Sequence, residues 1–348
     1  MSTWPIFPAT RDWLLDPETP GPRYLTLREV LRAPPGSPEL RAASAAAHRE
    51  GPIAAILDAM EPEGYWGKAG PGYGPKYYST VWSIIALGQL GASVAEDERA
   101  GRACAYLLDH ALAPGGQFSC NRGPAGTFDC LQGNLIAALL DLGGADPRLD
   151  AAFDWMARTV TGAGMAGKED RDAPLRFYGY KSGPLFRCRA NNDLSCAWGA
   201  AKVMLAFAKL PPSRRTPLID DAIGQGIDFL LAGEPAAAPW PSGYAERPSG
   251  NWWKFGFPVF YIADLLQVAE ALAGLGYGGD PRLAPTLALI AAKADGDGRW
   301  PLEYHYNGKM WPGVSFGRKG QPNKWVTIRA LRVLAMAGDA AGTHSIRA

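Results

Sequence analysis

The sequence contains little cysteine and little histidine, and it has no long run of apolar residues. Its 348 residues include five cysteines and four histidines. Five cysteines are few and odd in number, which argues against a secreted fold held together by disulfides. No apolar run reaches the roughly 18 residues of a membrane-spanning helix, and the first residues lack the basic and apolar regions of a signal peptide. We therefore expect a cytoplasmic protein, for which peripheral membrane contact through a surface patch stays open.

The sequence also lacks an excess of positive or negative charge. The 35 basic and 34 acidic residues give a formal net charge of +1, and no long run of either sign occurs, which argues against nucleic acid as a partner. Aromatic residues, by contrast, are plentiful, with 12 Trp, 13 Tyr and 12 Phe. They indicate either bulky core side chains or an aromatic-lined cavity. The oligomeric state is not readable from this composition.

A glycine–aromatic turn recurs five times along the chain. The turns begin at glycines separated by 52, 63, 64 and 55 residues, namely Gly64, Gly116, Gly179, Gly243 and Gly298. Self-similarity at such a period is typical of repeat architectures. One unit of this length does not bury its own apolar face, so we expect the units to stack on their neighbours.

Two kinds of helix alternate between these turns. The first kind is amphipathic and indicates an outer helix with one wet face; it is expected at 52–60, 97–111, 147–160, 217–232 and 281–294. The second kind is apolar nearly all round and indicates a buried helix; it is expected at 78–90, 130–142, 194–210, 259–275 and 325–336. The pattern predicts an all-α fold, a single α/α toroid of about five to six helical hairpins over residues 46–348, preceded by an N-terminal arm over residues 1–45.

The starts of the inner helices carry the best candidates for substrate binding. In such a barrel the inner helices run the same way, so their N-termini, with free N–H groups and partial positive charge, would surround one mouth of a central cavity. Cations there would hold an anionic head, and aromatic rings would line an apolar tube; helix packing is the alternative role for the rings. The candidates are Lys76, Tyr77, Tyr78, Trp82, Gln132, Asn134, Trp198, Phe257, Tyr261, Lys324, Trp325 and Arg329.

Four residues are candidates for proton transfer. Asp129 and Asp193 lie at the heads of two apolar helices, where a carboxyl group is either an acid or a helix cap. Glu303 and His305 follow the fifth turn on an expected loop. They would either act as a general acid–base pair or point outward to solvent.

Four cysteines occupy corresponding places in two adjacent repeats. Cys120 and Cys130 flank the turn into the second inner helix, and Cys188 and Cys196 flank the turn into the third. If the four thiols converge, they would suit zinc or an iron–sulfur cluster. The spacings match no tight metal knuckle, and cysteines also serve as small buried hydrophobes.

The repeated Gly-x-Trp/Phe turn before a buried helix resembles the repeats of triterpene cyclases and of protein prenyltransferase β subunits. Segments 297–303, 254–258 and 324–331 are similar to a bacterial single-toroid branch known as squalene cyclase-like, or prenyltransferase/squalene oxidase repeat, proteins. The resemblance covers roughly residues 50–340 and implies a toroid with an isoprenoid substrate in its centre. The chain departs from these families in lacking the Asp-x-Asp-Asp acid motif and a histidine beside Asp129 and Cys130 to complete the prenyltransferase zinc set.

The leading hypothesis is therefore an enzyme of the terpenoid-cyclase or prenyl-converting class acting on a small hydrophobic, isoprenoid-like substrate. Asp129 or Asp193 would be its acid, or metal-bound cysteines would polarise the substrate. One alternative is a non-catalytic isoprenoid- or lipid-binding protein that kept the cavity without the acid motif. Another is a lyase or hydrolase acting on a polar ligand. An open polar groove with two carboxylates would support this alternative.

Overall fold

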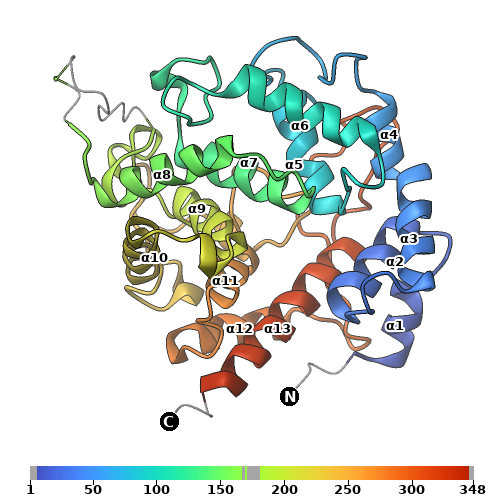
Figure 1. Ribbon diagram of the computed structural model, residues 1–348. Helices are drawn as coiled ribbons and strands as arrows, with labels where there is room; N and C mark the ends of the chain where they lie inside the picture. The colour runs from blue at the N-terminus through green and yellow to red at the C-terminus, as the bar shows by residue number, and fades with distance from the viewer. Residues whose placement is uncertain (1–5, 167–168, 171–180, 345–348) are drawn as a thin grey trace.

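The computed structural model describes residues 6–166, 169–170 and 181–344, with side chains up to Asp339. In this part of the chain the fold is all-α, with helices α1–α13 arranged in two layers around a centre (Figure 1). The one sheet there is a pair of two-residue antiparallel strands, β1 (Arg187–Cys188) and β2 (Leu194–Ser195). None of the described helices is long and apolar enough to cross a bilayer.

Five inner helices pack one on the next, in the order of the chain. They are α5 (Thr80–Leu90), α7 (Asp129–Asp141), α9 (Ala197–Lys209), α11 (Leu265–Gly274) and α13 (Lys324–His344). The first four are buried on almost every side, because their sequences are apolar nearly all round. The predicted inner layer is thus confirmed. Two of the inner helices start later than expected, because residues 194–195 form β2 and residues 259–264 are not helical.

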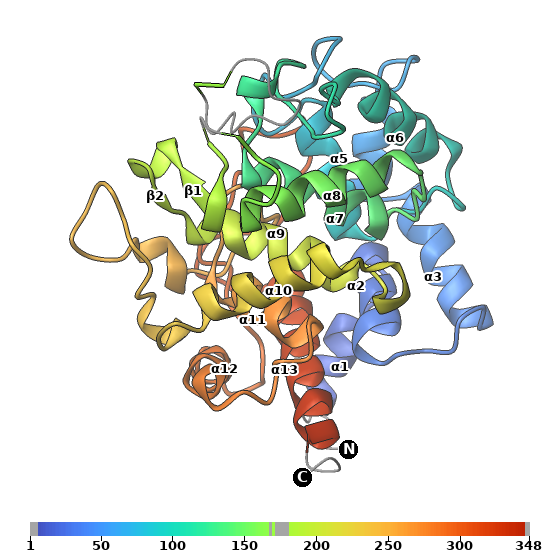
Figure 2. The same cartoon turned by 60° about the vertical axis from the view of Figure 1, so that its left-hand side comes forward.

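The outer layer consists of amphipathic helices that follow or precede the inner ones in sequence. Its members are α1 (Pro8–Leu14), α3 (Pro38–Arg49), α4 (Pro52–Asp58), α6 (Glu98–Ala111), α8 (Arg148–Thr161), α10 (Pro217–Leu230) and α12 (Ala284–Ala292). The turned view shows α8 and α10 packed together outside the inner helices α7 and α9 (Figure 2). Short 3₁₀ turns connect the layers: η2 (Pro124–Gly126), η3 (Pro184–Phe186), η4 (Arg189–Asn191), η5 (Pro212–Arg214), η6 (Pro235–Ala237), η7 (Gly250–Trp253) and η8 (Pro281–Leu283).

The N-terminal segment closes the ring. Helix α2 (Pro20–Leu25) and the π-helical turn η1 (Thr26–Val30) pack on α13. On the other side Leu25 lies against Gly91, where an added Cβ would come within 2.7 Å of the leucine side chain. Residues 20–30, expected as part of an arm, therefore take a place in the inner layer. The domain boundary between residues 45 and 46 stays a prediction.

Two of the five glycine–aromatic turns connect the two layers by the same set of hydrogen bonds. The fully buried Trp66 and Trp300 donate their indole N–H groups to carbonyls of the preceding outer helices α4 and α12, at 2.7 and 2.6 Å. Their backbone N–H groups donate to the hydroxyls of Thr80 and Thr327 on the following inner helices, at 3.1 and 3.0 Å. In the first and fifth turns one tryptophan thus binds an outer helix to an inner one.

The other three turns differ. In the second turn the backbone N–H of Phe118 donates to the side chain of Gln132, and Tyr244 of the fourth turn is exposed. The third turn, at Gly179, lies outside the described residues.

Helices α7 and α9 approach most closely at Gly133. An added Cβ at this position would lie 2.2 Å from the carbonyl carbon of Lys202, a backbone atom that has no room to move within α9. Glycine is therefore required here by the distance between two backbones, and not by an unusual torsion angle.

We expect Gly133→Ala to lower the free energy of unfolding by about 1–3 kcal/mol or more, because it overpacks the contact between the two helices. Gly224→Ala is the matched control, since an added Cβ there meets nothing within 4 Å on the exposed face of α10. Alanine favours helix over glycine, so the control should gain up to about 1 kcal/mol. Urea melts of both variants measure the difference, and equal stability of the two would contradict this packing.

Candidate functional site

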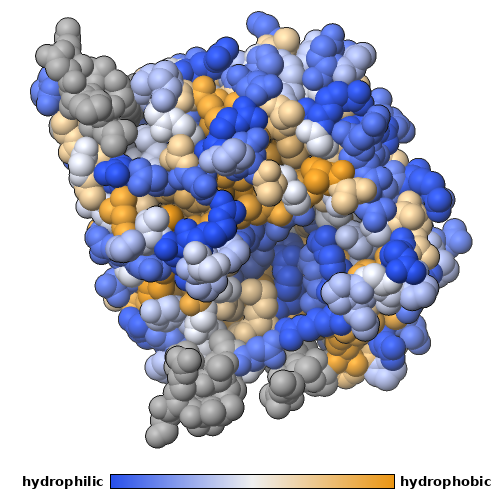
Figure 3. Space-filling model, in the orientation of Figure 1, coloured by the Kyte–Doolittle hydropathy of each residue, from blue (hydrophilic) through white to orange (hydrophobic). Residues whose placement is uncertain are grey.

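A cavity of about 380 Å³ lies at the centre of the ring. It extends from the middle of the inner helices to their C-terminal ends, where Gln89, Asp141, Lys209 and Gly274 line it from the last turns of α5, α7, α9 and α11. The space-filling view shows the hollow as a recess bordered by hydrophilic residues near the middle of this face (Figure 3). The sequence placed the mouth at the N-terminal ends of the same helices, so the cavity opens at the other end of the ring.

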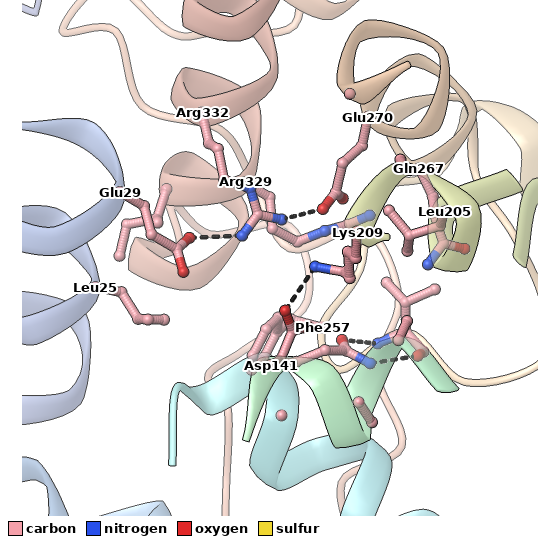
Figure 4. Close-up of a pocket in the computed structure, with 18 of the residues that line it drawn as sticks. Leu25, Glu29, Asp141, Leu205, Lys209, Phe257, Gln267, Glu270, Arg329 and Arg332 are labelled. Atoms are coloured by element: carbon pink, nitrogen blue, oxygen red, sulfur yellow. Dashed lines mark hydrogen bonds and ion pairs between the residues drawn. The ribbon is translucent and has the colours of Figure 1, made fainter. Parts of the chain in front are cut away.

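One side of the cavity is an ionic cluster formed by Glu29, Asp141, Lys209, Glu270 and Arg332. Arg332 of α13 lies between two carboxylates, 2.5 Å from Glu29 of η1 and 2.7 Å from Glu270 of α11 (Figure 4). Lys209 Nζ lies 2.6 Å from Asp141 at the end of α7. Buried charges are stable only when they are paired, and this cluster pairs each of its members.

The two carboxyl groups at opposite sides of this cluster differ in acidity. Burial alone would raise the pKa of Glu29, but the guanidinium groups of Arg332 and Arg28 lower that pKa to about 2. Burial raises the pKa of Asp141 above its ordinary value, although the Lys209 ammonium opposes this. Because the Asp141 side chain keeps 31% of its surface exposed and bonds Lys209, we describe the two as an ion pair.

Apolar side chains line the same cavity beside these charges. They are Leu25, Ile85, Leu205, Phe257, Val259, Trp325, Ile328 and Met336. Phe257 stacks on Trp325 with ring centroids 5.0 Å apart and an interplanar angle of 7°. The cavity thus offers a hydrocarbon surface next to a set of charges.

Buried polar groups form the floor. Arg329 makes two hydrogen bonds of 3.0 Å to the carboxylate of Asp264. Asn134 faces the same space and donates to a backbone carbonyl at 3.0 Å. Beneath them Lys202, whose side chain is wholly buried, donates its ammonium to the side-chain oxygen of Gln267. Gln267 itself lines the cavity.

Four of the twelve predicted substrate-binding residues line this cavity: Asn134, Phe257, Trp325 and Arg329. They come from inner helices or from the segment before α11, and they point to the centre as the ring model requires. The structure brings them together even though the cavity lies toward the C-terminal helix ends, because Asn134 and Arg329 are more than one turn inside their helices.

The aromatic residues predicted at the N-terminal mouth fill it. Tyr77 and Tyr306 have ring centroids 4.5 Å apart, and Trp82 meets Phe260 edge-on at 5.3 Å. Tyr261 lies 3.4 Å from Tyr77, hydroxyl to hydroxyl. These rings pack on one another, so the expected apolar tube is an aromatic plug between the helix N-termini.

The remaining candidates for substrate binding have other contacts. Gln132 accepts the backbone N–H of Phe118 and donates to its carbonyl, which holds the second turn against α7. Lys324 forms an ion pair of 3.0 Å with Asp16 in the N-terminal segment. Three further candidates also lie outside the cavity lining, namely Lys76, Tyr78 and Trp198.

The two aspartates proposed as acids lie in different environments, and neither lines the cavity. Asp129 is buried at the start of α7, and neither carboxylate oxygen has a hydrogen-bond partner in the described part of the chain. Burial, and then the neighbouring Cys188 thiol, raise the pKa of Asp129 well above its ordinary value. Asp193 lies in the left-handed turn between β1 and β2, 4.0 Å from Arg189, with 44% of its side chain exposed.

Glu303 and His305 make contacts that stabilise their loop. Glu303 accepts the backbone N–H of Phe255 at 2.7 Å and lies 2.6 Å from Lys293. His305 accepts the backbone N–H of Asn307 through Nδ1 at 3.1 Å. Neither residue lines the central cavity.

The predicted cysteine site shows partial convergence. A hydrogen bond from the Cys196 thiol lowers the pKa of Cys188 to about 7, so these two thiols lie together. Burial and then the nearby Cys188 raise the pKa of Cys130, so a third thiol lies close to the pair. Burial raises the pKa of Cys120 as well. Among the described residues, no group of three or more His, Cys, Asp or Glu side chains is placed to hold a metal ion. The geometry therefore does not fit zinc or an iron–sulfur cluster.

The ionic cluster was missed by sequence reasoning, although it left a signal. Lysine, arginine and glutamate are rarely buried unless they are paired, yet Lys202, Lys209, Glu270 and Arg332 occur inside the most apolar helices of the chain. Charged residues within otherwise apolar helices therefore predict the cavity lining better than the residues at the helix starts do.

Comparisons with known proteins found similarity at a low level. No family model and no curated protein matches the chain. Among solved structures, a protein from Actinoplanes is 16% identical, with 88% of this chain and 80% of that chain covered and a TM-score of 0.46. Type II terpene cyclase MstE from Scytonema, in complex with its substrate geranylgeranyl dihydroxybenzoate, is 16% identical, with 88% and 78% covered and a TM-score of 0.43. At these scores the fold assignment rests on the helices of this chain itself.

Proposed function

We propose that this chain binds a small amphiphilic molecule, isoprenoid-like in its apolar part, in the central cavity of its toroid. The observation that carries this proposal is the mixed lining, in which apolar side chains and the ionic cluster face the same cavity. A volume of about 380 Å³ lies near the lower end of the roughly 300–1,000 Å³ of small-molecule sites. The ligand is accordingly small, and long polycyclic products are disfavoured.

The polar end of the ligand would carry acceptor oxygens. Arg332 uses its terminal nitrogens for Glu29 and Glu270, but its Nε donor is buried and has no partner in the described part of the chain. A buried donor without an acceptor costs about 1–3 kcal/mol, so a hydroxyl, carboxylate or phosphate oxygen at this point would stabilise the bound state. This supports a head group placed at the ionic cluster.

Binding is better supported than protonation of an alkene. A cyclase of the expected kind needs a strong acid facing its substrate, whereas Asp129 lies outside the cavity lining and burial makes it a weaker acid. The cavity carboxylates Glu29, Asp141 and Glu270 are each bonded to an arginine or a lysine. We therefore favour the alternative of a non-catalytic isoprenoid- or lipid-binding protein with a terpenoid-cyclase-like fold.

A second candidate is proton transfer to a polar ligand such as a glycoside. One observation favours it: Glu29 and Asp141 line the same cavity, with the pKa lowered in the first and raised in the second. Such a division of two carboxyls is typical of acid–base pairs. Mass spectrometry of glycoside mixtures incubated with the protein tests it: a product that Asp141→Asn no longer forms would support this candidate, and unchanged mixtures would exclude it.

We expect Leu205→Trp to abolish binding of isoprenoid alcohols, with geraniol as the probe, because the indole would fill the apolar side of the cavity. Titration calorimetry measures the affinity, and the loss should be at least about tenfold. Leu205→Met is the matched control, since it conserves volume and should leave affinity within a few-fold. Equal geraniol binding by the Trp variant, or no binding by the parent chain, would count against a ligand in this cavity.

We expect Asp129→Asn to fold and to bind geraniol like the parent chain, and to melt at a higher temperature at pH 7. A carboxyl whose folded pKa is raised loses stability as pH rises above the ordinary Asp value of about 4, because the unfolded chain ionises first. The difference in melting temperature should therefore vanish near pH 4. A variant that stayed folded but lost its ligand would instead place Asp129 in the site.

Glu29→Gln should destabilise the fold by about 3 kcal/mol at pH 7, since the pKa of Glu29 is about 2 in place of the ordinary 4.5 and each unit corresponds to about 1.4 kcal/mol. A lowered acid pKa contributes stability above about pH 4.5, and this contribution disappears as pH falls toward 2. Denaturant melts between pH 2.5 and 7 should show the gap between variant and parent closing at low pH. A gap independent of pH would mean that the ion pair is not its cause.

A further inference from the structure

Lys202 occupies an unusual place on the cavity-facing side of α9. With Leu205 and Lys209 it forms a stripe at spacing i, i+3 and i+7, which is one face of a helix. The other two residues line the cavity. Lys202 lies one turn deeper and is wholly buried, and its ammonium donates to the side chain of Gln267, which lines the cavity. One amide group therefore separates the amine from the ligand space.

The two lysines of this stripe differ in their partners. Lys209 Nζ lies 2.6 Å from the carboxylate of Asp141, whereas the hydrogen-bond partner of Lys202 is a neutral amide. The nearby carboxylate of Asp264 already makes two hydrogen bonds to Arg329. Within the described residues no carboxylate forms an ion pair with Lys202.

The consequence is an amine that is neutral in about half of the molecules at pH 7. Burial lowers the pKa of Lys202 to about 7, although the Asp264 carboxylate opposes this. A lysine desolvated in this way is a nucleophile, because its nitrogen keeps a free electron pair. The amide hydrogen bond that holds it is also weaker than an ion pair, so Gln267 can release it.

We propose that Lys202 captures a carbonyl group of the molecule bound in the cavity as an imine, so that the ligand class is an apolar aldehyde or ketone. The inference rests on the proposed function, because the carbonyl compound must enter the same cavity. The neutral amine nitrogen attacks the carbonyl carbon, a C–N bond forms, and proton transfer gives a carbinolamine. Loss of the oxygen as one water molecule leaves the imine, and no oxidant or reductant takes part.

Reductive labelling of the unmodified protein tests this inference. The protein is incubated with limiting propanal and cyanoborohydride at pH 7, digested and mapped by mass spectrometry. Lys202 should carry the reduced adduct at least about tenfold faster than Lys209 and the exposed lysines, whose ordinary pKa of about 10.4 leaves few neutral amines. Its rate should level off above about pH 8, while the rates of the other lysines continue to rise.

Two variants provide the controls. Lys202→Met should lose the fast phase of labelling, and Lys319→Met, on the exposed surface away from the cavity, should keep it. Circular dichroism shows that each variant is folded. The mapping of the parent chain decides the question even if a variant does not fold. Labelling of exposed lysines with none at Lys202, or a pH profile of Lys202 equal to theirs, would overturn the proposal.

Geraniol separates this inference from the proposed function, because it has no carbonyl group. If geraniol binds and protects Lys202 from propanal, both proposals are supported. If Lys202 is labelled but geraniol does not bind, the reactivity of Lys202 is supported and the proposal of an isoprenoid-like ligand is contradicted. If geraniol binds and Lys202 stays unlabelled, the cavity binds its ligand without imine chemistry.

Discussion

The bridge that Arg332 makes between Glu29 and Glu270 is the interaction on which the rest of this molecule depends. It joins α13 to the N-terminal turn η1 and to α11, so the contact that closes the ring also sets the charge of the cavity. Removing one partner from a buried ion pair costs about 3–5 kcal/mol, because an uncompensated charge remains. An apolar replacement of the whole set would close the ring as well, so ring closure alone does not account for charges that face the cavity.

The direction of the inner helices explains where these charges lie. Gln89, Asp141, Lys209 and Gly274 belong to the last turns of four inner helices and line one cavity, so the negative ends of the helix dipoles converge there. Lys209 and Arg332 place positive charge beside these carbonyl ends, which is the favourable arrangement. At the N-terminal ends, where the helix dipoles are positive, uncharged aromatic rings from α5 and the neighbouring loops pack on one another.

The sequence predicted the fold because the fold rests on local patterns. The turn tryptophans and the apolar helices are periodic, and Trp66 and Trp300 make the same bonds in two repeats. The cavity depends on pairs that are far apart in the chain. Glu29 meets Arg332 across 303 residues, and no pattern within one helix indicates that partner. Asn134 and Arg329 were predicted as residues at the starts of inner helices, and they line the cavity because they lie more than one turn inside those helices. Which end of the ring opens depends on the packing of side chains from several loops, which no local pattern indicates.

Two lysines on one face of α9 show why the fold alone does not determine the chemistry. Lys209 meets a carboxylate and stays an ion-pair partner, and Lys202, two turns earlier, meets an amide. The helix, its face and the residue type are shared. The difference in proton affinity comes from burial, which is complete at Lys202 and partial at Lys209, and from the neighbouring side chains of other helices. Toroids that share their helices can thus differ in what they bind, because a few residues facing the centre set the charge and proton affinity of the cavity. For this chain those residues are a paired ionic cluster, the apolar side chains beside it, and Lys202 buried behind Gln267.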